Sequence, residues 1–192
     1  MLLASLDGVL GAPGATTIPV TDEGLLRGDG VFEVVRLYDG VPFALDDHLA
    51  RLLRSADGMR LPVDLGAYVT VATRVLDNLK TLSYGGNMLA GRLAKEAGAD
   101  EALLVTPHGR VLEGPTWSFF WVADGILRTP PLEERILASI TRARLLECCD
   151  VREETLVVDD LRAAEEAFIA STVREVMPLA AIDGVARPAA PA

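Results

Sequence analysis

The sequence predicts an α+β fold with a mostly antiparallel sheet, and three observations support that prediction. Short runs rich in β-branched and aromatic residues recur along the chain, separated by Gly, Pro and Asp turn signals, as is typical of strands. Other stretches carry apolar residues at helical spacing. Consecutive strands are joined by hairpin signals instead of regular βαβ units, which favours antiparallel pairing.

The first third of the chain predicts a hairpin followed by a helix. Residues 31–38 (VFEVVRLY) read as a strand, Asp39-Gly40 as a tight turn, and residues 41–45 (VPFAL) as the return strand. The next stretch, 46–59, has leucines at helical spacing, and Asp46 or Asp47 is a candidate cap.

The remainder alternates between helices and short strands. Helices are expected from about Tyr84 to Gly98, from Ser139 to Cys148, where Ser139 or Thr141 is a candidate cap, and at 159–166. Strands are expected at 101–106, 110–114, 117–122, 151–158, 167–172 and 175–180, with a last hairpin at Asp183-Gly184.

Composition and charge restrict the classes of function. The chain has 192 residues, half of them hydrophobic, and a net charge of −10, so nucleic acid and anionic membranes are not expected partners. The two cysteines, Cys148 and Cys149, are adjacent and form no disulfide framework. With no signal sequence and no long apolar run, the expected location is the cytoplasm.

Several residues could carry chemistry, although each also has a plain structural interpretation. Lys80, in NLKTLSYGGNMLA, could be a buried amine able to form a Schiff base, or a surface lysine at a strand end. Glu113 lies between two strand-like runs. It could be a buried carboxylate, which needs a partner, or an exposed residue at a strand edge. Arg51, three residues after His48, could bind phosphate or lie on a solvated helix face.

Two hydroxyl-bearing turns are weaker candidates for a phosphate site. SITR (139–142) opens a helix directly after an apolar run, and STVRE (171–175) follows another strand. Metal-ligand spacing, a P-loop and a dinucleotide-binding glycine motif are all missing from the sequence, so no metal is expected.

The ordered set of motifs is far more specific than any one of them. RGDGVFEVVRLYDGVPFALDDHLARLLRSA, LKTLSYGGNMLA, GADEALLVTPHGRVLEG, DGILRTPPL, SITR and FIASTVREVMPL follow one another between about Leu6 and Gly184. This series resembles the class IV (fold-type IV) pyridoxal-phosphate enzymes, which include branched-chain and D-amino acid aminotransferases and aminodeoxychorismate lyase. The resemblance implies a two-domain α+β fold, with a small α/β domain and a larger mixed, β-barrel-like domain.

The resemblance also implies a role for each matching residue. Lys80 would hold the aldehyde of pyridoxal 5′-phosphate as an aldimine, and Glu113 would pair with the pyridine nitrogen. The other cofactor-binding residues it implies are Tyr84 near the phenolic oxygen and, at the phosphate, Arg51, Ile140, Thr141, Ser171 and Thr172.

The implied reaction is transamination between a branched-chain or D-amino acid and a 2-keto acid. Phe32, Val34 and Arg36 would face the substrate, because alternate residues of a strand share one face, and Glu33 would point away. The alternative is an aminodeoxychorismate lyase that releases pyruvate and 4-aminobenzoate. A catalytically dead homologue ranks last, because both Lys80 and Glu113 are present. Trp117 and Ser118 stand where the family commonly has Ser and Asn, which leaves the substrate specificity open.

Length is the largest departure from the family. Its members are substantially longer, and nearly all of the shortfall falls between Leu61 and Thr73. Residues 1–66 are expected to form the small domain, without part of its sheet, and residues 67–192 the cofactor domain. The shortfall is either a real deletion or a segment that this sequence does not record. The resemblance also implies a homodimer.

Overall fold

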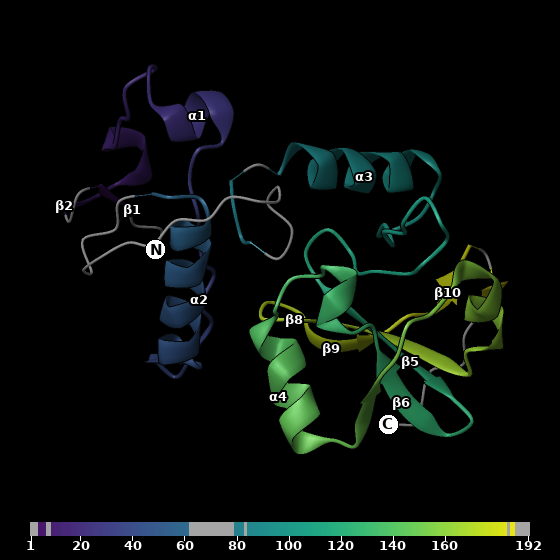
Figure 1. The fold of residues 1–192 in the computed structure, drawn as a ribbon. Coiled ribbons are helices and arrows are strands. Elements are labelled where there is room, and N and C mark those ends of the chain that lie inside the picture. The colour runs from purple at the N-terminus through teal and green to yellow at the C-terminus, as the bar shows by residue number, and fades with distance from the viewer. Residues whose placement is uncertain (1–3, 7–8, 62–78, 83, 184, 187–192) are drawn as a thin grey trace.

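The computed structural model describes residues 4–6, 9–61, 79–82, 84–183 and 185–186. Figure 1 shows the N-terminal elements on one side, a sheet covered by α4 on the other, and α3 lying above the sheet. The helices are α1 (Glu23–Arg27), α2 (Leu45–Gly58), α3 (Gly85–Glu96) and α4 (Ile140–Cys148), and the 3-10 turns are Pro13–Ala15, Leu132–Glu134 and Val158–Ala163. The strands are β1 (Ala4–Leu6), β2 (Val9–Gly11), β3 (Leu37–Tyr38), β4 (Val41–Pro42), β5 (Ser118–Ala123), β6 (Ile126–Thr129), β7 (Val151–Glu153), β8 (Glu166–Ser171), β9 (Glu175–Pro178), β10 (Ala181–Ile182) and β11 (Val185–Ala186).

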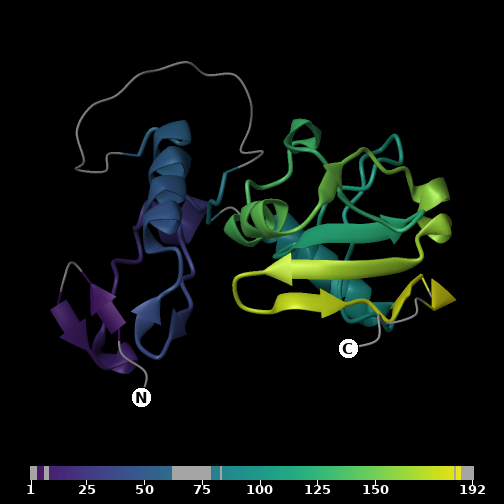
Figure 2. The same ribbon diagram turned by 90° about the horizontal axis from the view of Figure 1, so that it is seen from below.

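A five-stranded sheet in the order β7-β6-β5-β8-β9 forms the C-terminal part, and its long strands run side by side in Figure 2. The central strand β5 pairs antiparallel with both β6 and β8, β9 extends the sheet antiparallel to β8, and only the β6–β7 pair is parallel. Three antiparallel pairs out of four confirm the predicted antiparallel character. Three further hairpins, β1–β2, β3–β4 and β10–β11, lie outside this sheet.

Alternation along β5 and the residue before it fixes which face of the sheet is the core. Trp117, Phe119 and Trp121 share one face and belong to a buried apolar cluster with Val111, Leu156, Leu161, Ala164, Ala167 and Ile169. The rings of Phe119 and Trp121 stack with centroids 5.8 Å apart. Ser118 and Phe120 therefore belong to the opposite face. Helix α4 packs against β8.

Helix α2 forms where the leucine spacing predicts it, but its start differs from the prediction. The N-cap position is Ala44, in the left-handed region, and its side chain makes no capping bond; Asp46 and Asp47 lie inside the first turn. There their charges favour the positive end of the helix dipole. The buried residues of this helix include His48, Arg51 and Ser55, so its inward face is unusually polar.

Helix α4 begins as predicted. The N-cap is Ser139, whose Oγ accepts a hydrogen bond from the backbone N–H of Arg142 at 3.3 Å. The helix ends at Cys148, and Cys148 and Cys149 are exposed free thiols.

The predicted strand at 31–38 is mostly irregular, and regular pairing is restricted to β3 and β4 around the Asp39-Gly40 turn. Both turn residues have positive φ (49° and 81°), as a two-residue hairpin requires. The preceding residues pair instead with the segment around Lys80: Val31 forms an isolated bridge with Thr81, and Leu82 N–H donates to Gly30 O at 2.7 Å. The predicted strands at 101–106, 110–114 and 151–158 are likewise reduced to isolated bridges or to the three residues of β7.

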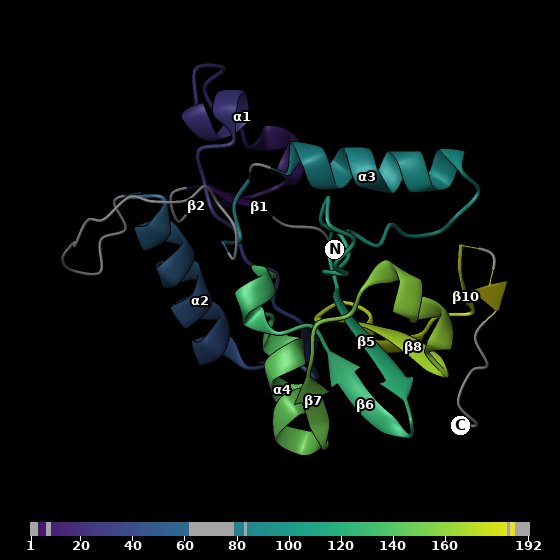
Figure 3. The same ribbon diagram turned by 45° about the vertical axis from the view of Figure 1, so that its right-hand side comes forward.

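Side-chain contacts connect the N-terminal elements to the C-terminal part. Arg36 donates to Val173 O at 3.0 Å, Tyr38 donates to Glu175 Oε1 at 2.8 Å, and Asp47 of α2 forms an ion pair with Arg144 of α4. Figure 3 shows α2 and α4 on facing sides of this junction. The expected domain boundary at 66/67 and the expected missing segment lie outside the described residues. Within the described part of the chain, no helix is long and apolar enough to cross a membrane.

Candidate active site

The backbone around Lys80 is fixed from two directions. Its N–H donates to Ser55 Oγ of α2 at 3.1 Å, and its carbonyl oxygen accepts from Phe32 N–H at 3.3 Å. These bonds hold the lysine where the RGDGVFE stretch meets α2. Its Nζ lies 4.2 Å from the ring centroid of Phe32 and 5.9 Å from that of Tyr84.

This environment changes the acidity of the amine. Burial lowers the pKa of Lys80, and the positive charge of Arg51 lowers it further, against the opposing charges of Glu33 and Glu113. A depressed pKa increases the fraction of neutral amine, which is the nucleophilic form. Lys80 is half-buried, so the exposed surface lysine does not describe this geometry, and the amine is less buried than the other alternative expected.

Glu113 is a buried carboxyl group with little compensation. Burial raises its pKa to about 7, although a hydrogen bond from Leu137 N–H (2.9 Å) and the charges of Arg142 and Lys80 oppose the shift. Among the described residues it forms no ion pair. A carboxyl group in this position is suited to a ligand that brings its own proton or positive charge.

Packing requires a glycine directly after Glu113. A Cβ at Gly114 would lie 2.0 Å from the indole ring of Trp117, which covers that backbone. The Gly114 N–H also donates to Trp117 O at 2.9 Å, so the turn that carries Glu113 is closed tightly. The indole Nε1–H in turn donates to Glu101 at 2.9 Å.

Lys80, Tyr84 and Glu113 line one cavity of about 260 Å³. This is just below the usual ~300–1,000 Å³ of small-molecule sites. Its remaining lining residues come from the segments around them and from the loop before α4: Leu79, Thr81, Asn87, Leu104, Leu112, Gly114, Pro115, Thr116, Trp117, Ser118, Arg135, Ile136, Leu137 and Ser139. The structure thus brings together an amine and a carboxyl group that are 33 positions apart in the sequence.

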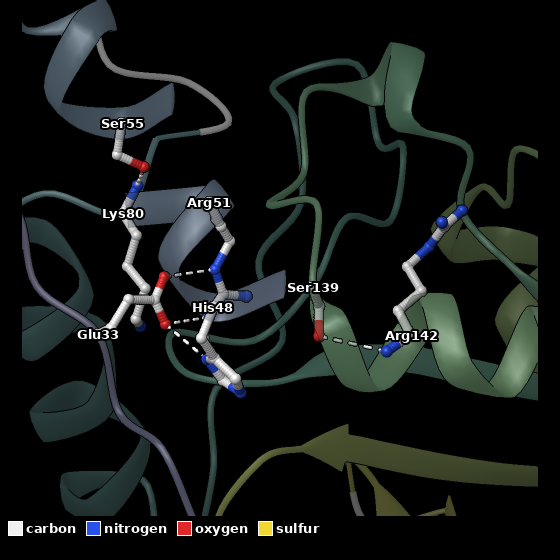
Figure 4. A network of polar contacts seen from close by, with 7 residues as sticks. All are labelled: Glu33, His48, Arg51, Ser55, Lys80, Ser139 and Arg142. Atoms are coloured by element: carbon white, nitrogen blue, oxygen red, sulfur yellow. Dashed lines mark hydrogen bonds and ion pairs between the residues drawn. The ribbon is translucent and has the colours of Figure 1, made fainter. Parts of the chain in front are cut away.

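A buried polar cluster of Glu33, His48 and Arg51 lies beside Lys80. Figure 4 shows the three side chains pointing toward one another. Glu33 accepts from Arg51 Nε at 2.6 Å and lies 2.9 Å from His48 Nδ1. Burial alone would raise the pKa of Glu33, but the hydrogen bonds to Arg51 and His48 outweigh it, and the pKa is lowered. Glu33 was predicted to point away from the substrate, but this pairing was not predicted, because only the opposite charges gave a signal for it.

The predicted phosphate residues lie at two ends of secondary structure. Ile140 and Thr141 form the first turn of α4, and Thr141 Oγ1 is buried without a hydrogen-bond partner among the described residues. Ser171 ends β8, its Oγ accepting from Arg174 N–H at 3.2 Å, and Thr172 follows in the turn. None of these four residues, all in the described part of the chain, lines the cavity, and neither does Arg51, whose guanidinium group faces Glu33.

The three predicted substrate residues occupy different surroundings. The ring of Phe32 lies against Lys80 Nζ and meets Tyr84 edge to face, with centroids 5.5 Å apart. Val34 is 42% exposed, and Arg36 is held by Val173 O and Glu175. None of the three lines the cavity in the described part of the chain.

The residues present fit pyridoxal 5′-phosphate. The cavity offers an amine with a lowered pKa for the aldehyde and a buried carboxyl group for the ring nitrogen. An unpartnered buried hydroxyl at the start of α4 adds a donor for an anionic group. No group of three or more possible metal ligands occurs among the residues that the structure describes.

Comparison with known proteins gives a consistent family. The family model "Amino-transferase class IV" matches residues 30–70 and 67–182. A protein of Methanocaldococcus jannaschii, provisionally named a branched-chain-amino-acid aminotransferase, is 31% identical, with 87% of this chain and 83% of that protein covered. D-alanine aminotransferase of Bacillus licheniformis is 27% identical, with the same shares covered.

Solved structures agree in fold. The branched-chain aminotransferase of Thermoproteus uzoniensis, with norvaline, has a TM-score of 0.87 at 26% identity and covers 99% of this chain and 90% of its own. A PLP-bound aminotransferase from Mycobacterium tuberculosis, described as hypothetical, has a TM-score of 0.86 at 25% identity and covers 98% and 93%.

The matched lengths differ between this chain and its relatives. The match to the M. jannaschii protein spans 239 residues, whereas 87% of this 192-residue chain is about 167 residues. The family-model match is also split, at residues 67–70. The matches in sequence and in fold nonetheless cover most of the chain. The chain therefore belongs to the class IV aminotransferases, the fold-type IV family of pyridoxal-phosphate-dependent transferases.

Proposed function

We propose that this aminotransferase moves an amino group between a branched-chain or D-amino acid and a 2-keto acid, with Lys80 as its catalytic residue. The observation that carries the proposal is the single cavity that Lys80 shares with Glu113. The family relationship gives the reaction type, and the names of the two relatives give the two classes of amino donor.

Pyridoxal phosphate, when bound, supplies an electron sink for the bond broken at the substrate α-carbon. Lys80 provides the amine that holds the aldehyde and, when substrate displaces it, the base that moves a proton. Its depressed pKa serves both tasks, because each begins with the neutral amine. Phe32 lies against this amine and keeps water from one side of it.

Glu113 holds the proton at the ring nitrogen. A carboxyl group whose pKa burial raises to about 7 gains a partner when a pyridinium nitrogen approaches it. The pair of opposite charges then offsets the cost of burying the carboxylate, which favours binding as well as catalysis. Tyr84, whose pKa burial raises, remains a neutral hydrogen-bond donor beside Lys80.

The phosphate would be anchored by Ile140 and Thr141 at the start of α4 and by Ser171 and Thr172 after β8. Arg51 would add its charge from α2, with Glu33 and His48 fixing the direction of its guanidinium group. Phe32, Val34 and Arg36 would form the substrate side. An anchored phosphate keeps the reacting bond aligned with the ring, which lowers the entropic cost of the reaction.

Assembly and domain organisation complete the proposal. Residues 1–66 form a small domain, residues 67–192 form the cofactor domain, and two copies associate in the cytoplasm. Helix α3 supports association, because none of its residues is buried and Met88, Leu89 and Leu93 are each at least half exposed. Sedimentation of the full chain, alone and as the Leu89→Glu variant, tests for the dimer.

The reaction is tested by amino transfer with branched-chain L-amino acids and D-alanine as donors and 2-oxoglutarate as acceptor. Lys80→Ala is expected to lower the rate by about 10²–10⁴-fold. Lys95→Ala is the matched control, because Lys95 is the other lysine of the chain and forms an exposed pair with Asp100. Borohydride reduction with pyridoxal phosphate should label the peptide containing Lys80. A transfer rate in Lys80→Ala equal to that of Lys95→Ala contradicts the proposal.

The lyase alternative has its own product. Release of pyruvate and 4-aminobenzoate from aminodeoxychorismate, without amino transfer to any 2-keto acid, would favour it. Labelling of Lys80 is expected in both cases, so only product analysis separates them.

A further inference from the structure

Ser118 is a polar residue that the proposed mechanism does not use. It begins β5, is 1% exposed and lines the cavity that also holds Lys80 and Glu113. Its hydroxyl has no hydrogen-bond partner among the described residues. A buried hydroxyl group without a partner carries a desolvation cost that a ligand can remove.

The position of Ser118 in the sheet relates it to both phosphate turns. Ser118 pairs directly with Ala170 of β8, one residue before Ser171 and two before Thr172. It lies on the face opposite the Trp117–Phe119–Trp121 core, and α4 packs against the neighbouring strand β8. Ser139, the N-cap of α4, lines the same cavity. Ser118 is therefore paired with the residue before one proposed phosphate turn and shares its cavity with the residue before the other.

The neighbouring hydroxyl groups are used differently. Ser139 Oγ accepts from Arg142 N–H, and Ser171 Oγ accepts from Arg174 N–H, so both already serve the backbone. Thr141 Oγ1 and Ser118 Oγ are the two buried hydroxyl groups without a partner in the described residues. Rotation about the Cα–Cβ bond of a serine moves its Oγ between staggered positions, so Ser118 can turn its hydroxyl to the cavity.

We infer that Ser118 is a further ligand of the cofactor phosphate, donating its hydroxyl proton to a phosphate oxygen from the sheet while Thr141 donates from α4. The inference rests on the cofactor site proposed above. It assigns to Ser118 a binding role and no part in proton transfer.

The test compares ligands with and without the phosphate on the full chain stripped of cofactor. Pyridoxamine 5′-phosphate and pyridoxamine are used, because neither forms a covalent bond to Lys80. Ser118→Ala is expected to weaken pyridoxamine 5′-phosphate by roughly 10- to 100-fold, the range for a hydrogen bond to a charged group, and to leave pyridoxamine unchanged. Dissociation constants are measured from the change in tryptophan fluorescence or by calorimetry.

Thr129→Val is the matched control. Thr129 is also fully buried in this sheet, but its Oγ1 donates to Phe119 O at 2.8 Å. Removal of this hydroxyl group should lower the melting temperature of the cofactor-free chain and leave the dissociation constants of both ligands unchanged. Ser118→Ala should leave that melting temperature equal or raise it, because it removes a hydroxyl group that has no partner.

Each outcome has a defined consequence. If Ser118→Ala weakens both ligands equally, weakens neither, or lowers the melting temperature as Thr129→Val does, the inference is wrong. If the unmodified chain binds pyridoxamine 5′-phosphate and Ser118→Ala binds it equally, the inference fails and the proposed function stands. If the unmodified chain binds neither ligand, both fall together.

Discussion

The two carboxyl groups nearest Lys80 are both buried, yet their surroundings are opposite. Glu33 bonds Arg51 and His48, and its pKa is lowered; Glu113 has one backbone donor, and its pKa is raised to about 7. The first belongs to a completed polar network that holds α2 to the RGDGVFE stretch. The second belongs to an incomplete one, at a cavity. Glu33 therefore stabilises the structure of the site, whereas Glu113 is available to bind a ligand.

The largest expected effect comes from breaking the completed network. Glu33→Ala leaves Arg51 and His48 buried without their carboxylate, so the free energy of unfolding should fall by about 3–5 kcal/mol. Urea unfolding of the cofactor-free chain measures it. Glu175→Gln is the control, because Glu175 pairs with Arg36 at the surface, where the loss should stay within about 1 kcal/mol. Equal losses in the two variants would mean that the Glu33 network adds nothing special.

Glu113 should give a smaller effect with a characteristic pH dependence. Its folded pKa of about 7 lies above its ordinary value of 4.5, so the unfolded chain ionises first as the pH rises. Stability is therefore complete below pH 4.5 and is lost between about pH 4.5 and 7, by about 3 kcal/mol in the cofactor-free chain. Glu113→Gln should remove this loss and become the more stable variant above pH 7.

Thermal unfolding across pH 4–8 checks this expectation. Pyridoxal phosphate should also flatten the profile of the unmodified chain, because the ring nitrogen gives the carboxylate a partner. An unchanged pH slope in Glu113→Gln would assign the dependence to other groups and remove the basis for treating Glu113 as the incomplete partner.

The sequence predicted those parts of the fold whose signals are local. Ser139 marked the start of α4, and Asp39-Gly40 marked the hairpin, because caps and two-residue turns depend on neighbouring residues. The irregular stretch before β3 could not be predicted, since bonds from Gly30 and Phe32 to the Lys80 segment decide its path. Asp46 and Asp47 were candidate caps, but the N-cap is the left-handed Ala44, two residues before Asp46.

The site shows the same division. Residue types at Lys80 and Glu113 suggested chemistry, but spacing alone left both with plain alternatives, because the cavity that joins them is a property of the tertiary fold. The resemblance to a family supplied their roles. It did not supply the pairing of Glu33 with Arg51, nor the unpartnered hydroxyl of Ser118, since both depend on which atoms meet in this particular chain.

The smallest effect sharpens the same comparison within the α4 end of the cavity. Ser139 and Ser118 both line the cavity, but Ser139 is committed to Arg142 N–H and Ser118 has no described partner. Ser139→Ala should therefore lower the free energy of unfolding by about 1 kcal/mol, the usual cost of a lost cap. The loss should be the same with and without pyridoxamine 5′-phosphate, because the hydroxyl serves the helix in both states. Urea unfolding under the two conditions measures it, and a loss that appears only with the ligand bound would mean that Ser139 leaves its cap to hold the phosphate.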